Sequence, residues 1–218
     1  MPSSNIKRSL SDSRLSTYEQ IVFNGTALST EQALKLYAWN AQVSAAFFAP
    51  LHLCEVVFRN AVSEALERKY GLNWPWNTTF ERSLPNPDRG YSPRRDLINA
   101  RNGQNTTGKV IPELKFVFWE KLLTRRFDDR LWTPFLHTVF PNHEVTLSVP
   151  EMRNKLRVLL ENVRGLRNRI AHHEPIIARD LELDFKNIDL LINYRCSDTA
   201  HWTYKNQLVT PLMELKPF

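Results

Sequence analysis

The chain of 218 residues contains little glycine and cysteine, with 6 and 2 residues respectively. The glycines form neither a phosphate-binding loop nor a nucleophile elbow, which excludes the common nucleotide-binding and α/β-hydrolase motifs. Cys54 and Cys196 stand far apart, which argues against a disulfide scaffold or a cysteine zinc site and favours a reducing cytoplasm. No apolar stretch runs uninterrupted for about eighteen residues, so we expect no membrane-spanning helix and no membrane partner.

Charge and composition give the first positive indications. Hydrophobic residues make up 42% and charged residues 24% of the chain, which is typical of a globular protein with a sizeable core. The net charge is +6, and 19 of the 29 basic residues are arginine. Because the planar arginine fork fits phosphate well, a polyanion such as RNA is a plausible partner. The alternative is a basic protein whose charge has no nucleic-acid role.

Helical periodicity dominates the chain, and strand signals are scarce. Residues 1–16 are rich in serine and basic, so we expect a flexible tail followed by one domain over residues 17–218. We predict an all-α fold of five to seven helices. A capping box begins the first helix at Ser29, and Pro50 ends it or begins the next one. The predicted helices cover residues 29–48, 51–70, 110–127, 128–140, 150–170, 180–193 and 200–215.

Residues 72–109 interrupt this pattern with turn-forming residues, apart from a short helical patch over residues 94–100. Six basic and two acidic residues lie between Arg82 and Lys109. We therefore predict an inserted basic loop that is either functional or disordered. Its candidate RNA-binding residues are Arg94, Arg95 and Arg101. Trp74 and Trp76 either fill the core or stack on a base.

The densest polar pattern lies at residues 164–175, where the helix over residues 150–170 ends. Arg164, Asn168 and His172 are spaced at i, i+4 and i+8, away from the apolar stripe, and Arg167 and His173 flank them. Arginine and histidine together can bind phosphate and move protons near neutral pH. Arg164 and Arg169 are therefore candidate RNA-binding residues. The alternative is that these residues, with Arg169, only complement the helix dipole and cap the helix.

A metal site is not expected at this helix end. His172, His173 and Glu174 are consecutive, and consecutive helical residues point about 100° apart, so they do not converge on one ion. No cofactor motif is present either. Glu55 and Arg59 are spaced at i and i+4 in an apolar helix and predict either a structural ion pair or, with Asn60, a group that orients the Arg/His cluster.

Arg167-Asn168 followed by His172 fits the Arg-x(4–6)-His motif of the HEPN superfamily. More of the chain resembles its Abi-like branch (abortive infection, AbiD/AbiF-type) over roughly residues 26–180. The segments that carry the resemblance are Leu36–Asn40, Glu55–Ala61, Tyr70-Gly71, Leu114–Trp119, Leu131-Trp132, Phe140-Pro141 and Leu166–Ile176.

The resemblance implies an all-α homodimer in which two motifs face each other across a cleft. It implies a metal-independent RNA endonuclease of a toxin or phage-defence system, restrained by an RNA or protein antitoxin. Arg167 then holds the scissile phosphate, His172 moves protons, and Asn168 positions the motif. His173 also fits the spacing. Two alternatives stay open, namely a HEPN fold that binds RNA or protein without cutting, and a helix-end cap in a structural dimer.

Overall fold

The computed structural model describes residues 2–23 and 29–218 of the chain. Within these ranges every regular element is helical and no strand occurs, which confirms the predicted all-α class. The α-helices are α1 (Pro2–Leu10), α2 (Asp12–Val22), α3 (Thr30–Tyr70), α4 (Thr78–Ser83), α5 (Pro93–Arg101), α6 (Thr107–Glu113), α7 (Phe116–Leu122), α8 (Thr133–Val139), α9 (Val149–Ala171), α10 (Leu181–Arg195), α11 (Ser197–Lys205) and α12 (Val209–Glu214). Three short turns of other helix types are η1 (Trp74–Trp76), η2 (Arg125–Phe127) and η3 (Asp128–Trp132).

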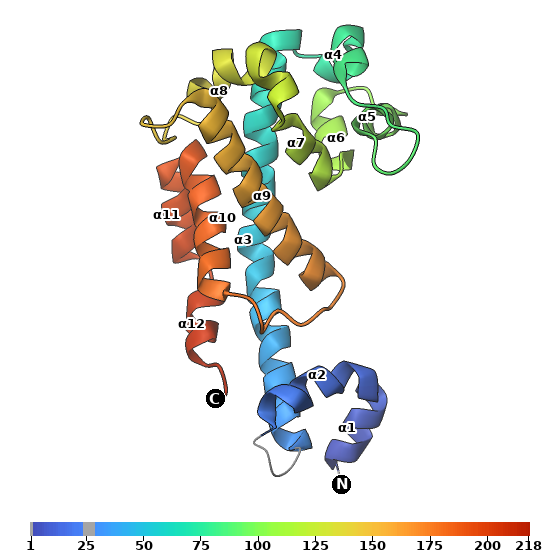
Figure 1. Ribbon diagram of the computed structural model, residues 1–218, viewed down its shortest axis with the longest axis vertical. Coiled ribbons are helices and arrows are strands. Elements are labelled where there is room, and N and C mark those ends of the chain that lie inside the picture. The colour runs from blue at the N-terminus through green and yellow to red at the C-terminus, as the bar shows by residue number, and fades with distance from the viewer. Residues whose placement is uncertain (1, 24–28) are drawn as a thin grey trace.

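Helix α3 runs through the length of the molecule (Figure 1). It begins as predicted, because the Ser29 hydroxyl accepts a hydrogen bond from the Gln32 amide. The predicted interruption at Pro50 is wrong, because the helix passes through this residue and is 41 residues long in total. Proline removes one helical hydrogen bond, but the Pro50 ring is buried and packing on both sides of it holds the helix together. The helix ends at Gly71, whose φ of 87° is one that glycine adopts readily.

Helices α9 and α10 pack against α3 and, with α2, α8 and α12, build the core around it (Figure 1). Helix α9 begins with a capping box formed by Ser148 and Glu151. Its buried stripe recurs every three or four residues as predicted, and its members are Met152, Leu156, Leu159, Leu160, Val163 and Leu166. The polar side of the same helix therefore remains open near its C-terminal end, where the Arg/His pattern lies.

The segment predicted as a flexible N-terminal tail is mostly helical over residues 2–16; Met1 lies outside the described residues. Helices α1 and α2 form there, and Leu15 is fully buried against α3. The Tyr18 ring lies 5.0 Å from the Tyr37 ring of α3, and Lys7 donates to the Glu19 carboxylate at 2.9 Å. The apolar residues of this segment are too few for a visible periodicity, so the sequence did not indicate that α1 and α2 pack on α3.

The segment over residues 72–109 is more ordered than the predicted loop. The expected patch near residues 94–100 is confirmed as α5, but η1, α4 and the start of α6 also form. Trp74 is fully buried and its indole donates to the Ser63 hydroxyl at 3.1 Å, so this tryptophan belongs to the core. Two predicted helices are broken. Residues 110–127 divide at the extended Leu114, and residues 200–215 divide after α11.

Helix α3 also bears on the expected absence of a membrane span. Its length and hydropathy would allow it to cross a membrane, although polar residues such as Asn40, Gln42 and His52 interrupt the apolar run. The core helix of a soluble protein meets the same criterion, and 33% of the apolar stretch is buried inside the fold. Packing against α2, α9 and α10 accounts for part of the apolar character of this helix.

Candidate functional site

The end of α9 is shaped by a tight C-terminal cap. The amide of Glu174 donates to the Arg169 carbonyl at 2.8 Å, and the amide of His173 donates to the Ile170 carbonyl at 3.0 Å. His173 has a φ of 55°, the left-handed conformation that such a cap requires. The backbone of this turn therefore caps the helix. Both His172 and His173 keep exposed side chains.

Arg167 lines a cavity of about 280 Å³ between α9 and α3. The polar residues around it are Arg167, Glu55, Arg59 and His52. Their helices account for the meeting, because His52, Glu55 and Arg59 stand at i, i+3 and i+7 on α3 and so share one face. The structure thus brings together three of the residues predicted from sequence.

Glu55 bridges the two arginines of this cavity. Its Oε1 lies 3.5 Å from Nη1 of Arg59, and its Oε2 lies 3.9 Å from Nε of Arg167. These distances are long for charge-assisted hydrogen bonds, so both guanidinium groups have N–H donors left for another acceptor. The predicted Glu55–Arg59 ion pair is confirmed in this loose form.

Arg59 is incompletely satisfied. Its side chain is only 14% exposed, and its Nε is buried with no hydrogen-bond partner among the described residues. A buried guanidinium with an unpaired donor is costly unless an acceptor reaches it. Two arginines and an imidazole around one cavity form a suitable environment for a phosphate, which would supply the missing acceptors.

His52 was not among the residues predicted from the sequence. Its side chain is exposed and lines the cavity with Arg167. The signal was available, because His52 stands one turn before Glu55 on the same helical face. His172 and His173 lie outside the set of residues that line this cavity. Within one chain, His52 is the imidazole that shares the cavity with Arg167.

The other motif residues have different surroundings. Arg164 pairs with Glu120 of α7 at 2.5 Å, and the Glu120 side chain is only 3% exposed. Arg169 donates to the Pro175 carbonyl at 2.8 Å and lies 3.6 Å from the Glu174 carboxylate. These two predicted RNA-binding arginines are thus engaged within the fold. Asn168 contributes its carbonyl to the His172 amide at 2.9 Å.

The predicted RNA-binding residues of α5 are also engaged internally. Arg94 and Arg101 both pair with Glu81 of α4, at 2.9 Å and 2.6 Å. Arg95 donates to the carbonyls of Pro87 and Gly90. These contacts hold the α4–α5 segment together. Figure 1 shows this segment near one end of the molecule, whereas α9 ends beside the middle of α3, so the two basic regions are not adjacent.

Asn60 is exposed on α3 and lies outside the set of residues that line the Arg167 cavity. Its predicted supporting role therefore has no contact with Arg167 in this structure. In the described ranges, no three histidine, cysteine, aspartate or glutamate side chains gather closely enough to hold a metal ion.

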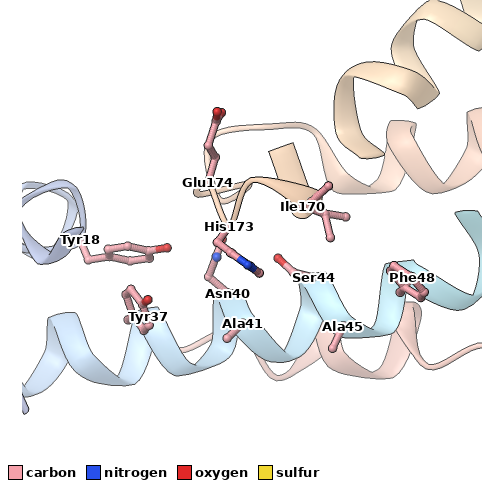
Figure 2. Close-up of a pocket in the computed structure, with 11 residues that line it drawn as sticks. Tyr18, Tyr37, Asn40, Ala41, Ser44, Ala45, Phe48, Ile170, His173 and Glu174 are labelled. Atoms are coloured by element: carbon pink, nitrogen blue, oxygen red, sulfur yellow. The ribbon is translucent and has the colours of Figure 1, made fainter. Parts of the chain in front are cut away.

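A larger groove of about 690 Å³ continues from the Arg167 cavity towards α2 (Figure 2). Phe48, Ile170 and Ala171 line both hollows, so the two are contiguous. Small residues of α3, Ala41 and Ala45, form the floor of the groove. The candidate site is thus an arginine-bearing cavity joined to a mainly apolar groove.

Comparison of this chain with models of known families, with curated proteins and with solved structures finds no match. The sequence resemblance and the geometry of the site are therefore the grounds on which function is proposed.

Proposed function

We propose that this protein is a metal-independent RNA endonuclease of the Abi-like HEPN type, acting as a toxin or in phage defence. The observation that carries the proposal is the Arg167 cavity, in which buried Arg59 lacks an acceptor for Nε. The resemblance over Leu166–Ile176 supplies the reaction class. The arginine-rich composition is consistent with a polyanionic substrate.

The reaction needs only groups that RNA and this chain supply. A base takes the proton of the ribose 2′-hydroxyl, whose oxygen attacks the adjacent phosphorus. The bond to the 5′-oxygen of the next nucleotide breaks, an acid protonates that oxygen, and a 2′,3′-cyclic phosphate remains. Arg167, with Arg59 beside it, would stabilise the charge on the phosphate. DNA lacks the nucleophile and is spared.

The proton-transfer role belongs to His172 by the resemblance. In one chain, His52 lines the same cavity as Arg167, and His172 is not among the residues that line it. The homodimer that the resemblance implies would instead bring exposed His172 of a second copy to this cavity. The two arrangements make different predictions for variants of the two histidines.

The test is cleavage of a labelled single-stranded RNA in EDTA by the wild type and by single alanine variants. We expect Arg167→Ala to lower the rate ~10²-fold or more. The matched control is Arg157→Ala, which removes an arginine of the same helix that pairs with Glu161 outside the cavity. Equal cleavage by Arg167→Ala and Arg157→Ala would contradict the proposal. Comparison of His52→Ala with His172→Ala shows which of the two imidazoles transfers protons in the reaction.

Mixing two inactive variants tests the composite dimer. If Arg167 and His172 act across the dimer, mixed dimers of Arg167→Ala and His172→Ala chains carry one intact site. Random exchange then restores roughly a quarter of wild-type activity. If both residues act within one chain, mixing restores nothing.

A non-catalytic RNA-binding or protein-binding module is the second candidate function. The observation that favours it is the position of His172 outside the residues that line the Arg167 cavity. This candidate predicts RNA binding that falls steeply with salt but yields no product. In that case Arg167→Ala changes affinity and no turnover is found.

A further inference from the structure

Residues 121–130 carry more positive charge than the fold uses. They run from the end of α7 through η2 into η3 and contain four basic and two acidic residues. Asp128 is buried and pairs with Arg153, so Asp129 is the one exposed acidic residue of this stretch. The stretch therefore presents net positive charge to solvent.

Lys121, Arg125 and Arg126 supply this charge. The side chains of Arg125 and Arg126 are exposed and make no ion pair or hydrogen bond among the described residues. The Lys121 side chain is 46% exposed, and its Nζ lies 3.5 Å from Oε1 of Glu120. In contrast to the arginines of α5, which are held within the fold, these three cations have N–H donors left for a ligand.

Two ion pairs fix the course of this stretch along α9. Glu120, just before it, pairs with Arg164, and Asp128 pairs with Arg153 at 2.9 Å. Arg153 and Arg164 are separated by about 16 Å along the helix axis. The residues between the two pairs therefore lie alongside α9, and the first of them stand at the end where α9 continues to Arg167 one turn later.

Helix α7, which precedes η2, lies on the same face of α3 as the Arg167 cavity. Ser63 follows Arg59 by one turn on α3 and accepts a hydrogen bond from the Trp74 indole at 3.1 Å. The Trp74 ring lies 6.2 Å from the Trp119 ring of α7, and α7 contacts both α3 and α9 (Figure 1). Because the cavity lies between the same two helices, the cations after α7 continue the row of positive charge that begins with Arg59 and Arg167.

We propose that Lys121, Arg125 and Arg126 form a basic path that binds the sugar–phosphate backbone of single-stranded RNA beside the scissile phosphate, an inference that rests on the proposed function. The phosphates of one strand follow one another at a regular spacing, so a strand held at Arg167 meets the cations of the path in turn. The arginine forks bind two phosphate oxygens each, and Lys121 binds as a point charge. Contacts to phosphate add affinity without sequence preference.

An anionic membrane surface is the other polyanion that such cations could meet. Segments that bind membrane surfaces combine basic residues with apolar side chains that enter the lipid. None of the exposed large apolar side chains lies within residues 115–130, and the basic path leads to a cavity with two further arginines. These observations favour a nucleic-acid strand as the ligand.

The experiment measures the binding of a labelled single-stranded oligodeoxyuridine of about 12 nucleotides by fluorescence anisotropy at several salt concentrations. The probe lacks the 2′-hydroxyl nucleophile, so it keeps its phosphates and is not cut. The triple variant Lys121→Gln, Arg125→Gln, Arg126→Gln removes the basic path. Because each phosphate contact contributes about 0.7 to the slope of log K against log salt, we expect a slope shallower by about 2 and an affinity roughly 10-fold or more lower at low salt.

A second triple variant removes the same charges from other surfaces. Arg8 of α1, Arg89 before α5 and Lys186 of α10 are exposed and make no side-chain ion pair or hydrogen bond among the described residues. Replacement of all three by glutamine should leave slope and affinity near those of the wild type. Equal losses in the two triple variants would mean that only net charge matters and would overturn the basic path. Each single variant of the path should flatten the slope by about 0.7, which keeps the test valid if the triple variant does not fold.

The outcomes separate this inference from the nuclease proposal. If the wild type cuts RNA in EDTA but the triple variant of the path binds the probe as the wild type does, the basic path is wrong and the nuclease proposal stands. If that variant shows the shallower slope and its control does not, the path stands even where no RNA is cut. Binding to phosphatidylglycerol vesicles that is lost in the same variant, with unchanged binding of the oligonucleotide, would assign the three cations to a membrane and overturn the path.

Discussion

Glu55 of α3 lies 3.9 Å from Arg167 of α9, measured between Oε2 and Nε, while its other oxygen lies 3.5 Å from Arg59. One carboxylate thus holds the two arginines of the cavity without satisfying either. An incoming phosphate would compete with Glu55 for the same donors. The relationship makes Glu55 a group that positions the arginines and restrains their affinity for anions.

Replacement of Glu55 by glutamine should therefore tighten RNA binding. The uncharged amide no longer neutralises Arg59 and Arg167, so we expect a several-fold gain in affinity and a salt dependence steeper by about one counterion. Fluorescence anisotropy with labelled RNA at several salt concentrations measures both. Glu161→Gln on α9 is the control, because Glu161 pairs with Arg157 outside the cavity. Unchanged or weaker RNA binding by Glu55→Gln would contradict the proposed competition between Glu55 and the RNA phosphate for the arginine donors.

Arg164 is expected to act on stability rather than on RNA. Glu120 is 2% exposed, and removal of Arg164 leaves its carboxylate buried with Lys121, at 3.5 Å, as its remaining ion-pair partner among the described residues. Breaking such a pair should cost about 3 kcal/mol in the free energy of unfolding. Urea denaturation of Arg164→Ala and of the double variant Arg164→Met with Glu120→Leu measures this, and the double variant should recover most of the loss. A stable Arg164→Ala protein with weakened RNA binding would instead support the role predicted from sequence.

Leu15 offers a test of the N-terminal helices. It is fully buried, so Leu15→Ala should cost about 2–5 kcal/mol through lost burial and the cavity left behind. Ile6 of α1 is 46% exposed, and Ile6→Ala should cost much less. Thermal and urea unfolding of the two variants provide the comparison. Similar small effects would mean that residues 2–22 do not pack on α3 in solution.

Glu81 should make stability depend on pH. Hydrogen bonds from Arg101 and, next in effect, Arg94 lower the pKa of Glu81 below its usual value of 4.5. A carboxyl group whose pKa is lower in the folded protein stabilises it above the unfolded pKa, and this contribution is lost as the pH falls through the folded pKa. Glu81→Gln should therefore melt at a lower temperature than the wild type at neutral pH. The difference should shrink as the pH falls below 4.5 and through the lower pKa of folded Glu81, and a gap independent of pH would contradict the assignment.

The sequence predicted best where one helix explains the pattern. The cap at Ser29, the buried stripe of α9 and the Glu55–Arg59 pair all depend on spacings within a single helix, and all three are found. The meeting of Arg167 with Glu55 depends on how α9 packs against α3. No local spacing determines that packing, although the supporting role assigned to Glu55 anticipated it.

The contacts that the sequence did not indicate have the same physical origin. Arg94 and Arg101 looked like solvent-facing charges because their partner, Glu81, lies on a different helix. His52 was overlooked because its place in the candidate site depends on the contact of its helix with Arg167, which is far away in the sequence. The stop expected at Pro50 followed a sound local rule that tertiary packing overrides.

Pro50 stands between the two hollows along α3. Asn40 and Ala45, which line the groove, precede it, whereas His52 and Glu55, which line the Arg167 cavity, follow it. Since proline has no amide hydrogen, the Ala46 carbonyl lacks its usual helical donor, and a helix bends most easily where such a bond is missing. Pro50 is therefore the point at which α3 would bend most easily. Bending there would move the groove relative to the Arg167 cavity while leaving the residues of each hollow together.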